Sequence, residues 1–183
     1  DRGAAALNLS FFTELPAPPG MEGGGVANAL VGTLRITALS TVFGVPVGVL
    51  SGVYLSEFGK KTLLGKSVRF TLNVIMGVPS IIVGLFVYTI LVVPFGRFSG
   101  MAGAVALALI MIPVVSRTTE DMLNLVPNSL RESALAVGAP RWKVTVGIVF
   151  RAAKSGMITG ILLAVARISG ETAPLLFTAL NSP

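Results

Sequence analysis

Two ionisable residues, Arg167 and Glu171, lie deep inside an apolar segment near the end of the chain. A charge at the centre of a lipid bilayer costs about 2.5 to 3.5 kcal/mol on insertion scales, so such residues are functional candidates by default. Four residues apart on a helix they would share a face and could simply pair. Buried ion pairs rarely outperform apolar replacements, which favours a functional interpretation. A guanidinium presents a planar fork of donors that suits an oxyanion, so Arg167 is the candidate for a substrate pathway. Glu171 would hold that guanidinium while the pathway is empty, and a gating or coupling role is equally open.

A third charge, Arg35, also lies within an apolar segment. At 1.5 Å per helical residue it would sit ~12 Å below the outer surface, and Arg167 would sit ~18 Å above the inner one. In a hydrocarbon layer ~30 Å thick the two depths are similar. Arg35 and Arg167 could therefore line one path, but snorkelling of Arg35 or pairing with a partner subunit explains its position equally well.

The composition identifies lipid as the solvent for most of this chain. Among 183 residues, 53% are hydrophobic and only 12% are charged, and the mean hydropathy is +0.85. Soluble domains carry roughly 25% charged residues. A transmembrane helix needs about 20 apolar residues. Four segments approach or exceed this length and predict an all-α, polytopic bundle, with a transmembrane domain over 26–180 and spans at about 27–56, 70–95, 98–116 and 155–180.

The basic residues predict which side each connection faces. Most of them follow the first span or lie in the segment 117–154 between the third and fourth spans. Positively charged connections are retained in the cytoplasm, so 117–154 is expected there. Residues 1–25, rich in proline and glycine, are then an irregular extracytoplasmic loop, and 181–183 are an extracytoplasmic end. The net charge of +6 is a topology signal, and binding of nucleic acid is not expected.

Several enzyme classes lack their residues. The chain has no histidine and no cysteine, which removes the usual zinc sites, histidine-dependent nucleophiles and disulfide scaffolds. The segment 59–67 looks like a phosphate-binding P-loop, but five residues separate its glycines where the motif has four, and no strand precedes it. We expect no metal and no cofactor in this chain, and no binding of ATP by it.

The segment 117–154 is too organised for a linker. Ser129 and Glu132 have the spacing of a capping box, and Gly138 stands where a left-handed cap would end a short helix. One face of that helix would carry Leu130, Ala134 and Val137. Such a helix could lie on the bilayer surface or dock into a groove of a partner, and composition alone leaves both open.

The order of residues in this segment resembles the coupling loop of ABC importer permeases, which reads E-A-A-x-x-x-G and then I-x-L-P. The chain has Glu132-Ser133-Ala134, then Gly138 and Ile148, with Ser133 in place of the first alanine and Phe150-Arg151 in place of Leu-Pro. Residues 167–176, Arg-Ile-Ser-Gly-Glu-Thr-Ala-Pro-Leu-Leu, are similar to the fifth-helix signature of phosphate permeases of the PstA type. Segments 15–20, 28–33 and 52–59 are similar to that family too.

The resemblance implies the fold of a type I ABC importer permease, with four of an expected six spans present. It further implies a transport subunit, not an enzyme, in a bacterial cytoplasmic membrane. Its partners would be a second phosphate permease, an ABC ATPase dimer that binds ATP and Mg²⁺, and an extracytoplasmic phosphate-binding protein. Coupling to the ATPase would run through the EAA-like helix, with the residues Leu130, Glu132, Ser133, Ala134, Val137 and Gly138. The alternatives are a permease for another oxyanion such as sulfate or molybdate, an intramembrane enzyme, or a structural membrane scaffold.

Overall fold

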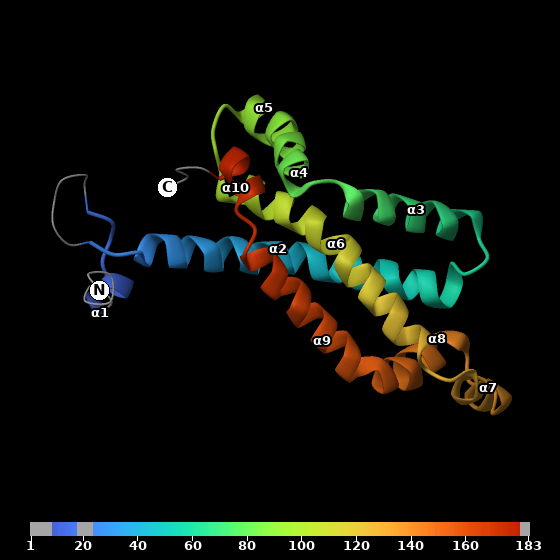
Figure 1. Ribbon diagram of the computed structural model, residues 1–183. Helices are drawn as coiled ribbons and strands as arrows, with labels where there is room; N and C mark the ends of the chain where they lie inside the picture. The colour runs from blue at the N-terminus through green and yellow to red at the C-terminus, as the bar shows by residue number, and fades with distance from the viewer. Residues whose placement is uncertain (1–8, 18–23, 180–183) are drawn as a thin grey trace.

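The computed structural model describes residues 9–17 and 24–179, and these residues form helices with no β-strand among them (Figure 1). Three of the helical elements are π-helices, written η, which continue a neighbouring α-helix with a wider turn. In chain order the elements are α1 (Leu9–Thr13), α2 (Ala27–Val53), η2 (Tyr54–Phe58), α3 (Leu63–Gly77), α4 (Ser80–Val87), η3 (Tyr88–Val92), α5 (Val93–Phe95), α6 (Gly100–Asn124), α7 (Asn128–Ala136), α8 (Arg141–Val144), η4 (Thr145–Val149), α9 (Phe150–Ser169) and α10 (Ala173–Thr178).

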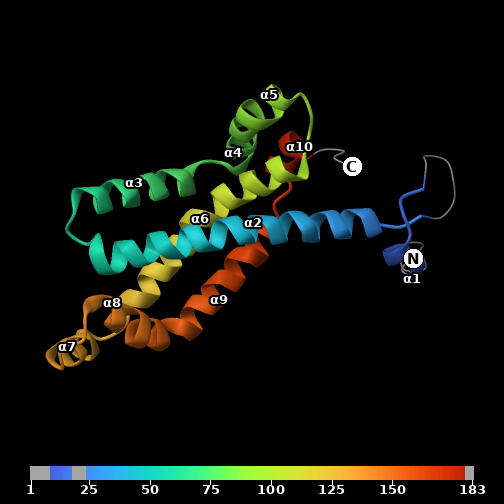
Figure 2. The ribbon, with the colours of Figure 1, turned by 180° about the vertical axis from the view of Figure 1, so that it is seen from behind.

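Three continuous helices in the described part of the chain are long and apolar enough to cross a membrane. They run over Ala27–Phe58, Gly100–Asn124 and Arg141–Ser169. The middle one, α6, is the most enclosed, because α2, α3, α4, α9 and α10 all pack against it. In both views α7 lies at the end of the bundle opposite to α1 (Figures 1 and 2). The assignment of these ends to the two sides of a membrane stays a prediction.

The span expected over 70–95 is not one straight helix in the structure but two helices, which together form a broken span or a re-entrant loop. α3 begins earlier, at Leu63, where the Thr62 side chain accepts a hydrogen bond from the Gly65 amide and caps the helix. The pair Leu63–Gly77 and Ser80–Phe95 then bends by 104°. Pro79 causes the break, because a residue before proline avoids the helical region, and Val78 is extended with φ −75° and ψ 130°.

The expected fourth span over 155–180 also differs from the structure. Its helix begins at Arg141, directly after Pro140, and ends at Ser169. Gly170 follows this helix, and the separate short helix α10 has Pro174 in its first turn. The expected separate segment 117–154 is correspondingly shorter. Residues up to Asn124 continue α6, and residues from Arg141 belong to the long last helix. Only α7 and its flanking connections stand apart.

The expected irregular loop over 1–25 contains one helix, α1, and residues 1–8 and 18–23 of that loop lie outside the described residues, as do 180–183. Elsewhere, small residues set the distance between spans. A Cβ at Gly48 would lie 2.7 Å from the Val115 Cβ, and one at Gly160 would lie 2.0 Å from Thr118 Cγ2. α2 and α9 therefore approach α6 more closely than larger side chains permit, as small-residue faces do between membrane helices.

Candidate functional site

A cavity of about 300 Å³ lies beside the bend between α3 and α4. Its wall consists of residues 75–80 at the bend, Ile110 and Val114 of α6, and the two charged residues Arg167 and Glu171. The break at Pro79 turns α4 away from the line of α3, and the end of α9 at Ser169 leaves Glu171 in the connection to α10. The break at Pro79 and the end of α9 thus lie beside the same cavity, and the charged residues Arg167 and Glu171 line it.

Arg167 and Glu171 share the cavity but do not share a helix face, contrary to the spacing argument. α9 ends two residues before Glu171, whose backbone amide donates to the Ile168 carbonyl at 3.1 Å. Within the described residues no ion pair of 4 Å or less joins the two side chains. Arg167 is exposed and Glu171 is half-buried. The simple explanation of these charges as a mutually neutralising pair therefore loses its geometric basis.

The wall of this cavity is suited to a small anion. Arg167 lies in the last turn of α9, where a cation interacts favourably with the carbonyl end of the helix. Ser80, the first residue of α4, also lines the cavity, and the start of a helix carries a partial positive charge. A guanidinium and a helix N-terminus are therefore presented to the same space, with one carboxylate available to balance the charge.

The third deep charge, Arg35, does not join this site. Its side chain is exposed on α2, and the wall of the cavity does not include it. The structure thus brings Arg167 and Glu171 together but does not place Arg35 with them.

The EAA-like helix is present as α7, but it starts differently from the expectation. The residue before its first turn is Pro127, no side chain caps it, and Ser129 lies inside the helix. The expected capping box is therefore wrong. Pro127, with φ −56° and ψ 140°, holds the extended geometry that precedes a helix, so the helix begins before Ser129. Gly138 ends the segment with a φ of +81°, the left-handed conformation expected of it.

The two faces of α7 differ in what they contact. Leu130 and Val137 are 45% and 86% exposed, whereas Ala134 is buried in an apolar cluster with residues of α6, α8, η4 and α9. Glu132 and Ser133 are exposed as well. The predicted apolar face is thus divided, with Ala134 turned towards the bundle and the larger side chains turned away from it.

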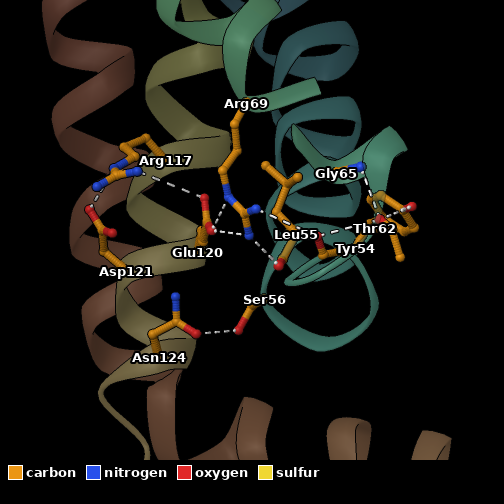
Figure 3. A network of polar contacts seen from close by, with 11 residues as sticks. Tyr54, Leu55, Ser56, Thr62, Gly65, Arg69, Arg117, Glu120, Asp121 and Asn124 are labelled. Atoms are coloured by element: carbon orange, nitrogen blue, oxygen red, sulfur yellow. Dashed lines mark hydrogen bonds and ion pairs between the residues drawn. The ribbon is translucent and has the colours of Figure 1, made fainter. Parts of the chain in front are cut away.

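A network of polar contacts holds the end of the bundle that carries α7 (Figure 3). Arg69 of α3 donates to Glu120 Oε1 of α6 at 2.8 Å and to the Leu55 carbonyl of η2 at 2.8 Å. Glu120 is only 5% exposed, so its charge depends on Arg69 and on Arg117, whose Nη1 lies 4.0 Å from Oε2. Next to it, the Ser56 hydroxyl donates to Asn124 Oδ1 at 3.0 Å.

A second buried pair lies between η2 and α7. The Arg131 guanidinium binds the Glu57 carboxylate and also donates to the Leu123 carbonyl at 2.6 Å. The Thr145 hydroxyl of η4 donates to the other oxygen of Glu57 at 3.3 Å. Exposure of the two charged side chains is 14% for Arg131 and 13% for Glu57. One carboxylate at the end of the first span therefore contacts both α7 and the start of the last span.

The sequence interpretation missed both pairs, because it counted Arg69 and Arg131 only as positive charges on the cytoplasmic side. The available signal was the position of Glu57 and Glu120, two carboxylates near the ends of apolar spans in an otherwise basic region. Neither partner is close in sequence, so spacing alone could not assign them. No group of three or more acidic, histidine or cysteine residues that could hold a metal occurs among the described residues.

Comparison with known proteins decides the family. The sequence model of the family described as "Binding-protein-dependent transport system inner membrane component" matches residues 44–183. The chain belongs to this family. As a family member with several helices long and apolar enough to cross a bilayer, it is a multi-pass membrane protein. The match includes the cavity, both buried ion pairs and α7.

Curated relatives cover nearly the whole of this family member. It is 51% identical over 181 residues to a phosphate transport system permease protein PstA of Yersinia pestis, and 53% identical over 182 residues to the PstA of Haemophilus influenzae. Each alignment covers 99% of this chain, but only 61% and 64% of those relatives. A probable PstA of Methanocaldococcus jannaschii is 44% identical over 156 residues, or 85% of this chain and 55% of that protein. The chain therefore spans about three fifths of the length of these relatives.

Solved structures confirm the fold. A chain from an inward-facing structure of the MetNI methionine ABC transporter matches with a TM-score of 0.75 over 82% of this chain and 72% of that one. A second inward-facing MetNI structure matches with a TM-score of 0.63 over 80% and 68% of the two chains. The identities are 22% and 24%, so these matches establish the architecture alone: the helical fold of a type I ABC importer permease.

Proposed function

We propose that this chain forms part of the permease subunit of an ATP-driven importer of inorganic phosphate in a bacterial cytoplasmic membrane. The observation that carries the proposal is the cavity at the two helix breaks, where Arg167 and Glu171 meet the start of α4. A desolvated oxyanion needs hydrogen-bond donors to replace its water, and a guanidinium supplies them. The relatives named as phosphate permeases support phosphate as the anion.

The remaining machinery of the importer would be supplied by other subunits. A second permease completes the translocation path, an extracytoplasmic protein delivers phosphate, and a dimer of ABC ATPases binds ATP and Mg²⁺. α7 is the proposed docking element for the ATPase, because Leu130 and Val137 present apolar side chains outward. Glu132 adds a charged contact beside them, and Gly138 sets the angle to the next helix. Helices in such a position commonly dock into a groove of a partner.

The deciding experiment is uptake by proteoliposomes that contain the full-length permease with its partner subunits. We expect ATP-dependent accumulation of radiolabelled phosphate that excess unlabelled phosphate abolishes and excess sulfate or molybdate does not. Accumulation that sulfate or molybdate suppresses more strongly than phosphate would assign the permease to another oxyanion. Absence of any ATP-dependent anion accumulation by a correctly assembled complex would overturn the proposal.

A further inference from the structure

The contact between Glu57 and Arg131 lies apart from the cavity of Arg167 and Glu171, at the end of the bundle that carries α7. Glu57 is in η2, the π-helical continuation of the first span, and Arg131 is in α7. The contact is enclosed, with both side chains less than 15% exposed. A guanidinium bound to a carboxylate is directional and resists sliding, unlike a contact between apolar side chains.

Few other contacts hold α7 to the bundle. It packs against α8 and η4, and Ala134 is its one buried residue within the described chain. Arg131 adds two connections to other spans: Glu57 at the end of α2 and the Leu123 carbonyl in α6. Among the described residues, Arg131 is therefore the strongest polar link between α7 and the helices Ala27–Phe58 and Gly100–Asn124.

The other end of the contact is equally well connected. Three successive residues of η2 bind three different helices: the Leu55 carbonyl accepts from Arg69 of α3, Ser56 donates to Asn124 of α6, and Glu57 binds Arg131 of α7. Figure 3 shows the first two of these contacts side by side. If α7 moves and displaces Glu57, the rest of η2 moves with it. Because η2 is hydrogen-bonded to α3 and α6, the displacement reaches those two helices as well.

A role in stability alone is a poor explanation of this arrangement. Arg131 Nε is buried and has no hydrogen-bond partner among the described residues, so the guanidinium loses hydration that it does not fully recover. A buried ion pair is also often no more stabilising than apolar residues of similar volume. What an apolar replacement would lack is a fixed, directional connection.

We propose that Glu57 and Arg131 are positioning residues that transmit the displacement of α7 to α2 and α6 during transport. This inference rests on the proposed function, in which α7 docks on the ATPase. The connection acts as a rigid strut: α7 and η2 move together, and the bond between them persists through the cycle. The Thr145 hydroxyl has two acceptors within reach, the Arg141 carbonyl at 3.0 Å and the second Glu57 oxygen at 3.3 Å, and its one proton helps to orient the carboxylate when it points to Glu57.

The first test compares ATP hydrolysis with phosphate uptake in proteoliposomes of the full assembly. In Glu57→Gln and in Arg131→Gln we expect the phosphate transported per ATP hydrolysed to fall at least tenfold while ATPase association is kept. Arg151→Gln is the control for the loss of one arginine, because Arg151 is exposed on α9. The reversed pair, Glu57→Arg with Arg131→Glu, should recover much of the ratio. An unchanged ratio in Arg131→Gln would overturn the proposal.

The second test makes the strut covalent. Residues 1–183 contain no cysteine, so Glu57→Cys with Arg131→Cys introduces the only thiols into this part of the permease. Before reaction this variant should be uncoupled, and a short bis-maleimide that joins the two thiols should restore the ratio in the same preparation. Bridged protein that stays uncoupled would show that the contact must open during the cycle, which contradicts a rigid strut.

The third test does not depend on the transported anion, and it also decides the case in which a neutral variant assembles poorly. Single spin labels are placed at Val137, directly after α7, and at Leu34 on α2, which are 86% and 72% exposed. In the parent assembly ATP should change both spectra. With Arg131→Gln, only the Val137 label should respond. An ATP response at both labels without phosphate uptake would reject phosphate but keep the strut, and an unaltered Leu34 response in this variant would reject the strut.

Discussion

Arg167 is the residue on which the proposed anion path depends most. It lines the cavity, and no carboxylate pairs with it within the described residues. We expect Arg167→Gln to abolish phosphate uptake, because the neutral amide cannot replace the hydration of an anion. Arg151→Gln is the control on the same helix, exposed and outside the cavity wall, and it should transport normally. Radiolabelled uptake by assembled complexes measures both, and parental uptake by Arg167→Gln would remove this residue from the path.

Glu171 should act on the anion through charge and not through a direct pair. Removing its charge in Glu171→Gln leaves the guanidinium of Arg167 unopposed across the cavity, so phosphate should bind at least as tightly and leave more slowly. The maximal rate of uptake should then fall several-fold while the apparent KM stays the same or decreases. Steady-state uptake at varied phosphate concentration separates these quantities. A higher KM with an unchanged maximal rate would contradict this role.

Residue-level chemistry was only partly accessible from the sequence. Arg167 and Glu171 could be found because charges inside apolar segments stand out. Their relation could not, because the spacing argument assumes one continuous helix and Gly170 ends it. The partnership of Glu57 with Arg131 was also inaccessible, because the two are 74 residues apart and nothing local connects them.

At the scale of elements, the backbone conformation of Gly138 sets the orientation of α7, the proposed coupling helix, relative to α8. Its φ of +81° is a conformation that β-branched residues adopt only with strain. We expect Gly138→Val to shift α7 relative to α8 and to lower the phosphate transported per ATP hydrolysed. Gly138→Asn, which tolerates the left-handed region, should stay close to the parent. Tight coupling in Gly138→Val would exclude α7 as the transmitting element.

The contact between α2 and α6 allows a comparison of two glycines on one helix. A Cβ at Gly48 would lie 2.7 Å from the Val115 Cβ, whereas one at Gly32 meets no atom within 4 Å. Gly48→Ala should therefore lower the stability of the full-length protein by about 1 to 3 kcal/mol through overpacking. Gly32→Ala should raise it by up to about 1 kcal/mol, since alanine is the better helix former. Unfolding of the purified protein in denaturing detergent measures both signs, and a neutral Gly48→Ala would contradict the tight seam.

Helix boundaries show where sequence patterns stop being informative. Hydropathy identifies apolar segments but carries no information about the direction of the helix axis. The 104° bend at Pro79 lies inside one long uncharged segment and was therefore not predicted. Charged residues mark the membrane edge, yet they are good helix formers, so the last helix continues through Lys154 and Arg151 back to Arg141. Gly138 was correctly identified because its requirement is local: a left-handed residue after a short helix favours glycine.

At the scale of the whole molecule, the class of the fold follows from composition and the arrangement does not. An apolar chain with few charges must satisfy its backbone internally, and helices do so in lipid. Which helices touch is decided by glycine faces and by buried ion pairs, such as that of Arg69 with Glu120. The resemblance to a permease family supplied the architecture that these patterns alone left open, and the MetNI structures confirm it.

The close contacts at glycine residues also separate a rigid part of the molecule from a part that can move. α2, α6 and α9 meet where a single added methyl group would collide, at Gly48 with Val115 and at Gly160 with Thr118. Helices packed this closely have little room to slide past one another, so α2, α6 and α9 should move as one rigid body. α3 and α4 are joined by the bend at Pro79, and a Cβ added at Gly77, the last residue of α3, would meet no other atom within 4 Å. Amide hydrogen exchange of the assembled importer should therefore be slowest along the seam and faster at residues 77–80, with ATP altering the second set alone. Equal protection of both sets would mean that residues 77–80 are as rigid as α2, α6 and α9, which would contradict a hinge at this bend.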